Sequence, residues 1–253
     1  IVNSAGHGND PPGVTWQWGG EINTVPTGTP EGQAAIVVAL DEMLRPVVNY
    51  RCNTHVHVGV PGLADDLDGL KTMLRFILAW SEFVWEHVDP IPRPTRDEFV
   101  TAAEFEGAVK RWRRSKVSHH QRYPEAWAAA GLAAGPIDEF REGIRPMRSR
   151  HLAPRAGINL LPLWVHGTIE FRHFYGLRSG RAAESCCAWA GGFVTGALGG
   201  GPNPAELLAS RPWSFPRKRP YDHDLELRYQ ATKVDAAKKA AKMRAEMKAK
   251  GIR

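Results

Sequence analysis

Two short segments, NTHVHVGV at residues 53–60 and TIEFRHF at residues 168–174, alternate between polar and apolar residues. Successive side chains of a β-strand point to opposite faces, so this period of two predicts strands with one apolar face. On the second strand the apolar face would hold Ile169, Phe171 and His173. Charged side chains are costly to bury unless they are paired. The pattern therefore predicts a sheet that packs on helices with one face and lines a cleft with the other.

Segments with a period near 3.6 residues predict the helices that accompany this sheet. Residues 31–45 form one such segment, which Pro46 should end. Residues 67–88 form a second segment, which is amphipathic along its whole length. A third helix should follow, because Thr95 and Glu98 have the spacing of a capping box.

The remaining segments complete the predicted order of elements. Residues 115–155 are polar and rich in Arg and His, which indicates loops over a site or a partner surface. Strand-like segments are found at 19–26, 157–164 and 167–176, and small residues at 180–198 predict a close-packed helix. This order indicates a mixed α/β or an α+β domain.

The net charge of +6 is concentrated at the C-terminus. Residues 228–253 hold nine Lys or Arg and two acidic residues, a net charge of +7, so the rest of the chain has a net charge of −1. We predict a domain at 1–211, a linker rich in Pro and Arg at 212–227, and a basic tail that is helical or disordered. Such a tail is either solvated or binds an acidic partner or nucleic acid.

Composition and missing motifs narrow the class of protein. No window approaches the apolar length of a membrane span, and residues 1–20 lack the pattern of a signal peptide. The three cysteines, Cys52, Cys186 and Cys187, do not suggest a disulfide framework. We therefore expect a cytoplasmic protein without a membrane partner. The sequence has no P-loop, dinucleotide-binding or nucleophile-elbow motif.

Polar residues on the two strands are the candidates for chemistry. His55 and His57 share one face of their strand, and Glu170 and Arg172 share one face of theirs. Glu21 adds a second carboxylate. Carboxylates and imidazoles suit Mg²⁺ or Mn²⁺, and a guanidinium suits a phosphate or a carboxylate. Three other interpretations are a solvated polar face, a surface charge pair, and a metal-dependent hydrolase whose third ligand is not evident.

The combination of segments resembles the amidoligase family, ATP-dependent carboxylate–amine ligases related to glutamine synthetase and glutamate–cysteine ligase. The resemblance covers most of residues 15–200 and rests on GGEINTVP, CNTHVHVGV, RAGINLLPLW and TIEFRHFYG. It implies an α+β fold with a mostly antiparallel open sheet, helices packed on one face and an active-site cleft on the other. This is a glutamine synthetase-like catalytic fold, which residues 1–211 would form.

The resemblance also implies a metal and phosphate site. Glu21 and Glu170 would bind the Mg²⁺ or Mn²⁺ ions that bridge the phosphates of ATP. His55 would contact the metal, and His57 would contact the metal or the γ-phosphate. Arg172 would stabilise charge on the transferred phosphoryl group.

Two further residues and the reaction itself follow from the same resemblance. Arg155 and Asn159 would contact the nucleotide or the substrate. ATP would phosphorylate a carboxylate, an amine would attack the acyl phosphate, and an amide would be released. The substrate would be a peptide, a protein or a cell-wall-like molecule.

The chain departs from the family pattern at two places. The family opens with a strand that carries an acidic pair, whereas Asp10 is the only acidic residue before Glu21. This strand either lies upstream of Ile1 or has been lost. Asn53 stands where the family usually has Gly.

The alternative function is a non-catalytic structural or binding protein that keeps the fold and binds an acidic partner through its tail. Ligase-like sequences of this kind also resemble ones carried by bacteriophages. If a bacteriophage encodes this chain, the non-catalytic alternative includes a virion component.

Overall fold

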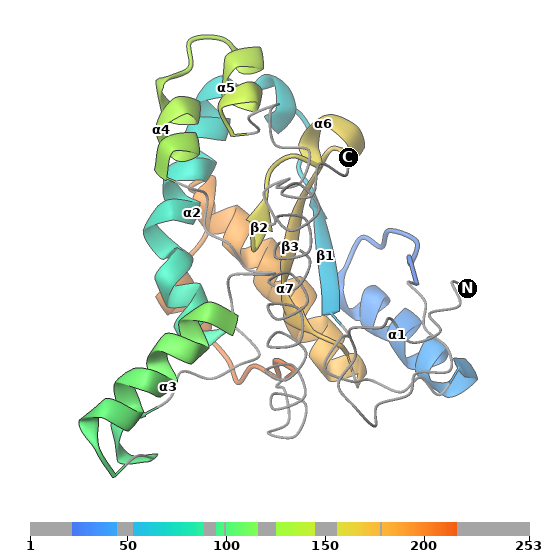
Figure 1. Ribbon diagram of the computed structural model, residues 1–253. Helices are drawn as coiled ribbons and strands as arrows, with labels where there is room; N and C mark the ends of the chain where they lie inside the picture. Colours follow the sequence, from blue (N-terminus) through green and yellow to red (C-terminus); the bar gives the residue numbers. More distant parts are fainter. Residues whose placement is uncertain are drawn as a thin grey trace, which may run out of the picture. The chain divides into compact units, whose positions relative to one another are not determined.

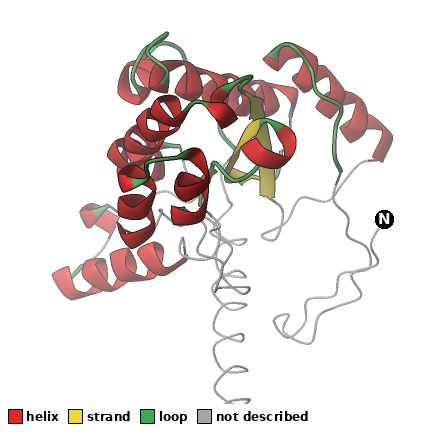
Figure 2. Cartoon of the chain, turned by 90° about the horizontal axis from the view of Figure 1, so that it is seen from above, coloured by secondary structure: helices red, strands yellow, loops and turns green. Residues whose placement is uncertain are grey.

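The computed structural model describes residues 22–44, 53–88, 95–98, 100–115, 125–144, 156–177 and 179–216. These ranges contain eight α-helices and a three-stranded antiparallel open sheet, so the described part of the chain is α+β as predicted. Figure 2 shows that helices make up most of this part and that the sheet is small.

The sheet consists of β1 (Asn53–Gly59), β2 (Ile158–Asn159) and β3 (Thr168–Tyr175). β3 lies in the middle and pairs antiparallel with both neighbours. In Figure 1, β1 and β3 run side by side, and β2 flanks β3 on its other edge. The two alternating segments of the sequence therefore become neighbouring strands.

A β-bulge interrupts the pairing of β1 with β3. Val56 pairs with Phe171, but Thr54 pairs with Phe174, so two residues of β3 stand opposite one residue of β1. A bulge shifts the alternation of faces by one residue. Phe174 therefore takes the core position that simple alternation assigns to His173, which is itself buried. The prediction that His173 shares the apolar face with Ile169 and Phe171 was therefore wrong at the end of this strand.

The apolar face of the sheet packs on α7 (Gly180–Ala197), which in turn packs on α2 (Leu67–His87). Phe171 meets Phe193 of α7 with ring centroids 5.7 Å apart, and Phe193 meets Phe76 of α2 at 5.0 Å. Both pairs are edge-to-face, a favourable geometry for aromatic rings. Both helices lie where the sequence predicts them, so this part of the core is built from predicted elements.

Two more helices pack on α7. α1 (Pro30–Leu44) confirms the first predicted helix and ends before Pro46. α8 (Pro204–Ala209) begins with a capping box in which Asn203 and Glu206 bond to each other's backbone amides. No sequence pattern described above predicts α8.

The third predicted helix begins later than expected. The Thr-x-x-Glu pattern at Thr95 forms only the 3₁₀ turn η2 (Arg96–Glu98). α3 (Ala102–Ser115) begins after a second pattern of the same kind. Here the backbone N and Oγ1 of Thr101 both donate to Glu104 Oε2 at 3.0 Å, and Glu104 N donates to Thr101 Oγ1 at 3.2 Å. The reciprocal bonds, rather than the spacing alone, fix the helix start.

The prediction of loops over residues 115–155 was wrong for much of the segment. It contains α4 (Glu125–Ala133) and α5 (Ile137–Gly143). Alanine, the best helix former, makes up much of α4. Phe140 and Ile144 are fully buried in the core cluster. Packing of these apolar residues stabilises helices in an otherwise polar region.

Two predicted strands were too long or misplaced. In residues 157–164 only β2 is a strand, and α6 (Leu163–His166) follows it. Gly167 has φ of 67°, a left-handed conformation that ends α6 and leads into β3. Residues 22–27 form no regular element, so the strand expected at 19–26 is not present in its described portion.

The core extends beyond residue 211 into the segment that the sequence suggests as a linker. Trp213 Nε1 donates to the carbonyls of Leu207 and Leu208, both at 3.1 Å. The rings of Trp213 and Phe215 stack with centroids 5.6 Å apart. Residues 213–216 are therefore packed, and Pro216 is buried. The predicted tail lies outside the described residues.

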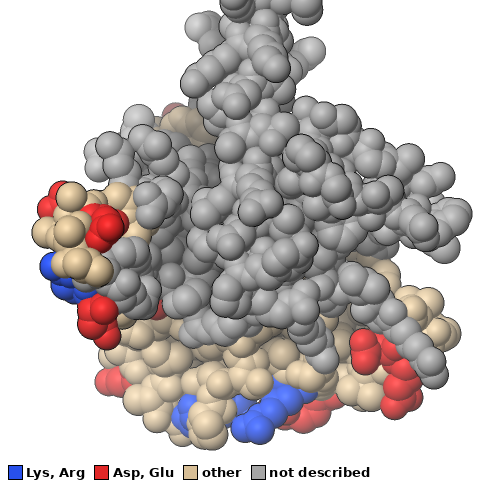
Figure 3. Space-filling view, turned by 60° about the horizontal axis from the view of Figure 1, so that its bottom comes forward, with Lys and Arg blue, Asp and Glu red and all other residues tan. Residues whose placement is uncertain are grey.

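The described surface carries charges of both signs. On the face in Figure 3, Lys and Arg side chains lie near Asp and Glu side chains. This mixture agrees with the small net charge of the chain before its tail.

Among the helices that the structure describes, none combines the length and the apolar composition of a membrane span.

Truncation of Phe193, which has no exposed surface, should destabilise the fold. Phe193→Ala removes the ring between β3 and α2, and we expect a loss of about 3 to 5 kcal/mol in the free energy of unfolding. Urea denaturation followed by circular dichroism measures this loss. Val165→Ala, at a side chain that is 74% exposed, is the control and should change the value by less than about 0.5 kcal/mol. Equal effects of the two changes would contradict the core described above.

Candidate functional site

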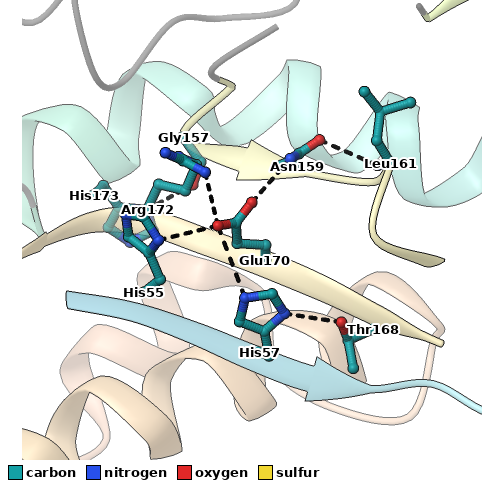
Figure 4. A network of polar contacts seen from close by, with 9 residues as sticks. All are labelled: His55, His57, Gly157, Asn159, Leu161, Thr168, Glu170, Arg172 and His173. Atoms are coloured by element: carbon teal, nitrogen blue, oxygen red, sulfur yellow. Dashed lines mark hydrogen bonds and ion pairs between the residues drawn. The ribbon is translucent and has the colours of Figure 1, made fainter. Parts of the chain in front are cut away.

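Polar side chains from all three strands converge on the carboxylate of Glu170 (Figure 4). Arg172 Nη1 donates to Oε1 at 2.8 Å, and His55 Nδ1 lies 3.1 Å from the same oxygen. Asn159 Nδ2 donates to Oε2 at 2.9 Å. His57 Nε2 lies 3.8 Å from Oε1, close enough for electrostatic attraction but too far for a hydrogen bond. Glu170 is therefore the centre of the cluster.

Strand register explains why these residues meet. His57 of β1 and Asn159 of β2 both stand directly opposite Glu170 of β3, which makes a row across the sheet. Arg172 is two residues further along β3 and shares the face of Glu170. Its backbone N donates to the carbonyl of Gly157 at 2.7 Å, which ties β3 to the chain just before β2.

Glu170 is buried, with 6% of its surface exposed. Burial is the largest influence on its carboxyl group and by itself raises the pKa. Hydrogen bonds from His55 and Asn159, together with the charge of Arg172, outweigh burial and lower the pKa of Glu170 from 4.5 to about 2. The side chain is therefore ionised at neutral pH and can only accept hydrogen bonds.

His57 has a second polar partner on β3. Its Nδ1 lies 2.9 Å from Thr168 Oγ1, and the ring of His166 lies 6.4 Å away, edge-on. Burial lowers the pKa of His57 below 6.5 and outweighs the opposite effect of the Glu170 carboxylate. His57 is therefore neutral at neutral pH. The contact with Thr168 was not predicted, although the alternation places Thr168 and Glu170 on one face.

Asn159 has a supporting role in this arrangement. Its Oδ1 accepts from Leu161 N at 3.1 Å, while its Nδ2 donates to Glu170. Exchanging the two ends of the amide would bring its oxygen against a carboxylate. The side chain is buried and both ends are engaged, so Asn159 fixes the position of the Glu170 carboxylate. The resemblance to amidoligases implies a direct contact of Asn159 to the nucleotide or the substrate.

The structure brings together most of the residues that the sequence singled out, namely His55, His57, Asn159, Glu170 and Arg172. Glu21 and Arg155 lie outside the described residues.

The described donor set does not by itself fit a divalent metal ion. Mg²⁺ prefers several oxygen ligands, but the cluster has one carboxylate, whose oxygens already face Arg172, His55 and Asn159. Within the described ranges, no three His, Cys, Asp or Glu side chains are placed to hold a metal. Glu21 would supply the second carboxylate that the sequence analysis expected.

One side of the cluster is accessible. The side chains of His57, His55 and Arg172 are 41%, 33% and 23% exposed. Gly59, two residues beyond His57 on the same strand, has open space where a Cβ would lie. A ligand can therefore approach His57 from the side of Gly59.

The neighbouring cysteines of α7 do not form a second site. Burial raises the pKa of Cys187 to about 11 and raises that of Cys186 as well. Both side chains are therefore thiols at neutral pH, which are poor nucleophiles. This agrees with the close-packed helix predicted at residues 180–198.

Comparison of the chain with family models, with curated proteins and with solved structures found no match.

The low pKa of Glu170 makes fold stability depend on pH. Because the folded value is about 2 and the ordinary value is 4.5, ionised Glu170 stabilises the fold above about pH 4.5 by about 3 kcal/mol. This contribution is lost as the pH falls toward 2. We expect Glu170→Gln to lower the free energy of unfolding at neutral pH, and the difference from the natural chain should shrink over that acidic range.

Urea denaturation at a series of pH values measures this difference. Glu31→Gln is the matched control, because Glu31 is exposed on α1 and should contribute little at any pH. A difference between Glu170→Gln and the natural chain that does not change between neutral pH and pH 2 would contradict the low pKa.

Proposed function

We propose that the protein is an ATP-dependent carboxylate–amine ligase that works through an acyl phosphate. The observation that carries the proposal is the row of His57, Glu170 and Asn159 across the sheet, with Arg172 and His55 beside it. The resemblance to amidoligases assigns a role to seven residues, and these are five of them. Their convergence from three separate segments is what a shared site requires.

Arg172 is the residue best placed to bind phosphate. A guanidinium has five N–H donors, and the contact with Glu170 uses one of them. Glu170 holds the guanidinium of Arg172 in position. The exposed part of that guanidinium can donate to phosphate oxygens as a fork. His57, neutral and accessible, adds a hydrogen bond without adding charge. Together they position and neutralise a transferred phosphoryl group.

The proposed reaction needs no nucleophile from the protein. An oxygen of the substrate carboxylate attacks the γ-phosphorus of ATP, and ADP leaves. The nitrogen of the amine substrate then attacks the carbonyl carbon of the acyl phosphate, and the amide forms as phosphate leaves and takes one N–H proton. The protein contributes by holding the two substrates in line. The partners of Glu170 among the described residues are Asn159, Arg172, His55 and His57, none of which is a hydroxyl or thiol nucleophile.

The proposal extends to Mg²⁺ or Mn²⁺ as the partner of the ATP phosphates, with Glu21 as an additional ligand. The substrate class we propose is a peptide, a protein or a cell-wall-like carboxylate together with an amine.

A second candidate function is a non-catalytic binding protein that keeps this fold. The observation in its favour is that side chains of the protein engage both oxygens of Glu170. A carboxylate that serves only to join three strands would have the same contacts. In this case the basic tail would mediate binding to an acidic partner.

Titration calorimetry of the full chain with ATP and Mg²⁺ tests the first candidate. Arg172→Lys keeps the charge that faces Glu170 but loses the fork of donors, so ATP affinity should fall about tenfold or more. Gly59→Glu should also weaken ATP binding, since it adds a negative charge beside His57. Formation of ADP on addition of amino acids and dipeptides then tests for ligation.

Each of these variants has a matched control. Arg211→Lys alters an arginine that pairs with Glu184 away from the cluster, and it should leave ATP affinity unchanged. Gly59→Gln has the size of Gly59→Glu without its charge and should bind ATP better than Gly59→Glu. Equal ATP affinity in all four variants would place the nucleotide elsewhere. Absence of ATP binding to the natural chain would overturn the ligase proposal in favour of the second candidate.

A further inference from the structure

The hydrogen bonds around Glu170 determine which nitrogen of His55 carries a proton. Arg172 and Asn159 each donate to one oxygen of Glu170, so the carboxylate acts as an acceptor at both. His55 Nδ1, at 3.1 Å from Oε1, must therefore be protonated, because a bare nitrogen would set two lone pairs against each other. In the neutral ring the other nitrogen, Nε2, is then an acceptor.

His57 meets the same carboxylate through its other nitrogen. Nε2 lies 3.8 Å from Glu170 Oε1, a distance at which an N–H dipole is attracted and a lone pair is repelled. Nδ1 lies 2.9 Å from Thr168 Oγ1, and a hydroxyl can donate to a bare nitrogen. The contact with Glu170 favours a proton on Nε2, and the hydroxyl of Thr168 then donates to the bare Nδ1.

We propose that His55 and His57 are held as opposite tautomers, with the proton on Nδ1 in His55 and on Nε2 in His57, and that Thr168 is the positioning residue for His57. The strand register makes this possible. Thr168 stands opposite Gly59, which has no side chain. The hydroxyl of Thr168 therefore has room to reach diagonally across the strand pair to His57.

Opposite tautomers give the two imidazoles different capacities toward a ligand. His57 offers an N–H donor, and His55 offers a lone pair, from side chains that are 41% and 33% exposed on one face. This consequence rests on the proposed ligase function. There, His57 would donate to a phosphoryl oxygen, and His55 would accept from an N–H of the amine substrate.

Nuclear magnetic resonance of the full chain with ¹⁵N-labelled histidine tests the tautomers directly. Long-range ¹H–¹⁵N spectra at mildly alkaline pH, where imidazoles are ordinarily neutral, distinguish protonated from bare ring nitrogens. His55→Gln and His57→Gln each remove one ring and so assign the signals. We expect a protonated Nδ1 in His55 and a protonated Nε2 in His57. The same tautomer in both rings would overturn the proposal.

Variants of Thr168 test its positioning role. Thr168→Val keeps the shape of the side chain without the hydroxyl, so the ¹⁵N signal of the bare Nδ1 of His57 should shift as this nitrogen loses its hydrogen bond. Thr168→Ser restores the hydroxyl and should restore the signal. The His55 signals should not change, which shows that the sheet is intact. An unchanged His57 signal in Thr168→Val would overturn the role of Thr168.

Addition of ATP and Mg²⁺ to the labelled chain separates this inference from the proposed function. Opposite tautomers whose signals do not respond to ATP would support the inference and contradict the ligase site. A response to ATP with identical tautomers in both rings would do the reverse. The spectra of the natural chain remain decisive for the tautomers even if Thr168→Val does not fold.

Discussion

Antiparallel pairing of β1 with β3 is the interaction on which both the sheet and the candidate site depend. It joins segments so distant that His57 and Thr168, which touch, are separated by 111 positions in the chain. Closing so long a loop costs conformational entropy. Burial of Ile169 and Phe171 on the opposite face of β3, against α7 and the helices beyond it, offsets that cost. The polar face is thus held in register by the apolar face.

The sequence predicted the parts of the site that follow from covalent geometry. Because side chains of a strand alternate, the patterns alone placed His55 with His57 and Glu170 with Arg172 on shared faces. The bulge near His173 was not predictable in this way, because register depends on how the two strands pack. The start of α3 at Ala102 has a local cause: two equal patterns compete, and the helix begins where Thr101 and Glu104 bond reciprocally. The helices α4 and α5 were missed because the chain around them is polar and rich in Arg and His, although α4 itself is mostly alanine.

Glu170 shows how one buried charge can organise a surface. A buried carboxylate is costly without partners, and here each partner comes from a different position in the sheet. The same contacts that stabilise the charge orient Arg172 and the histidines. Fold and site therefore share one set of hydrogen bonds, and a change that weakens one weakens the other. This sharing separates the cluster from a row of independent surface residues.

The bulge in β3 has a consequence for how this strand can change during evolution. It divides β3 into a segment that carries Glu170 and Arg172 and a segment that begins at Phe174, each with its own register against β1. Insertions or deletions in a regular strand turn every later side chain to the other face. A strand that already contains an additional residue has a place where such a slip is absorbed. The far end of β3 can thus vary in length while the polar row stays in line.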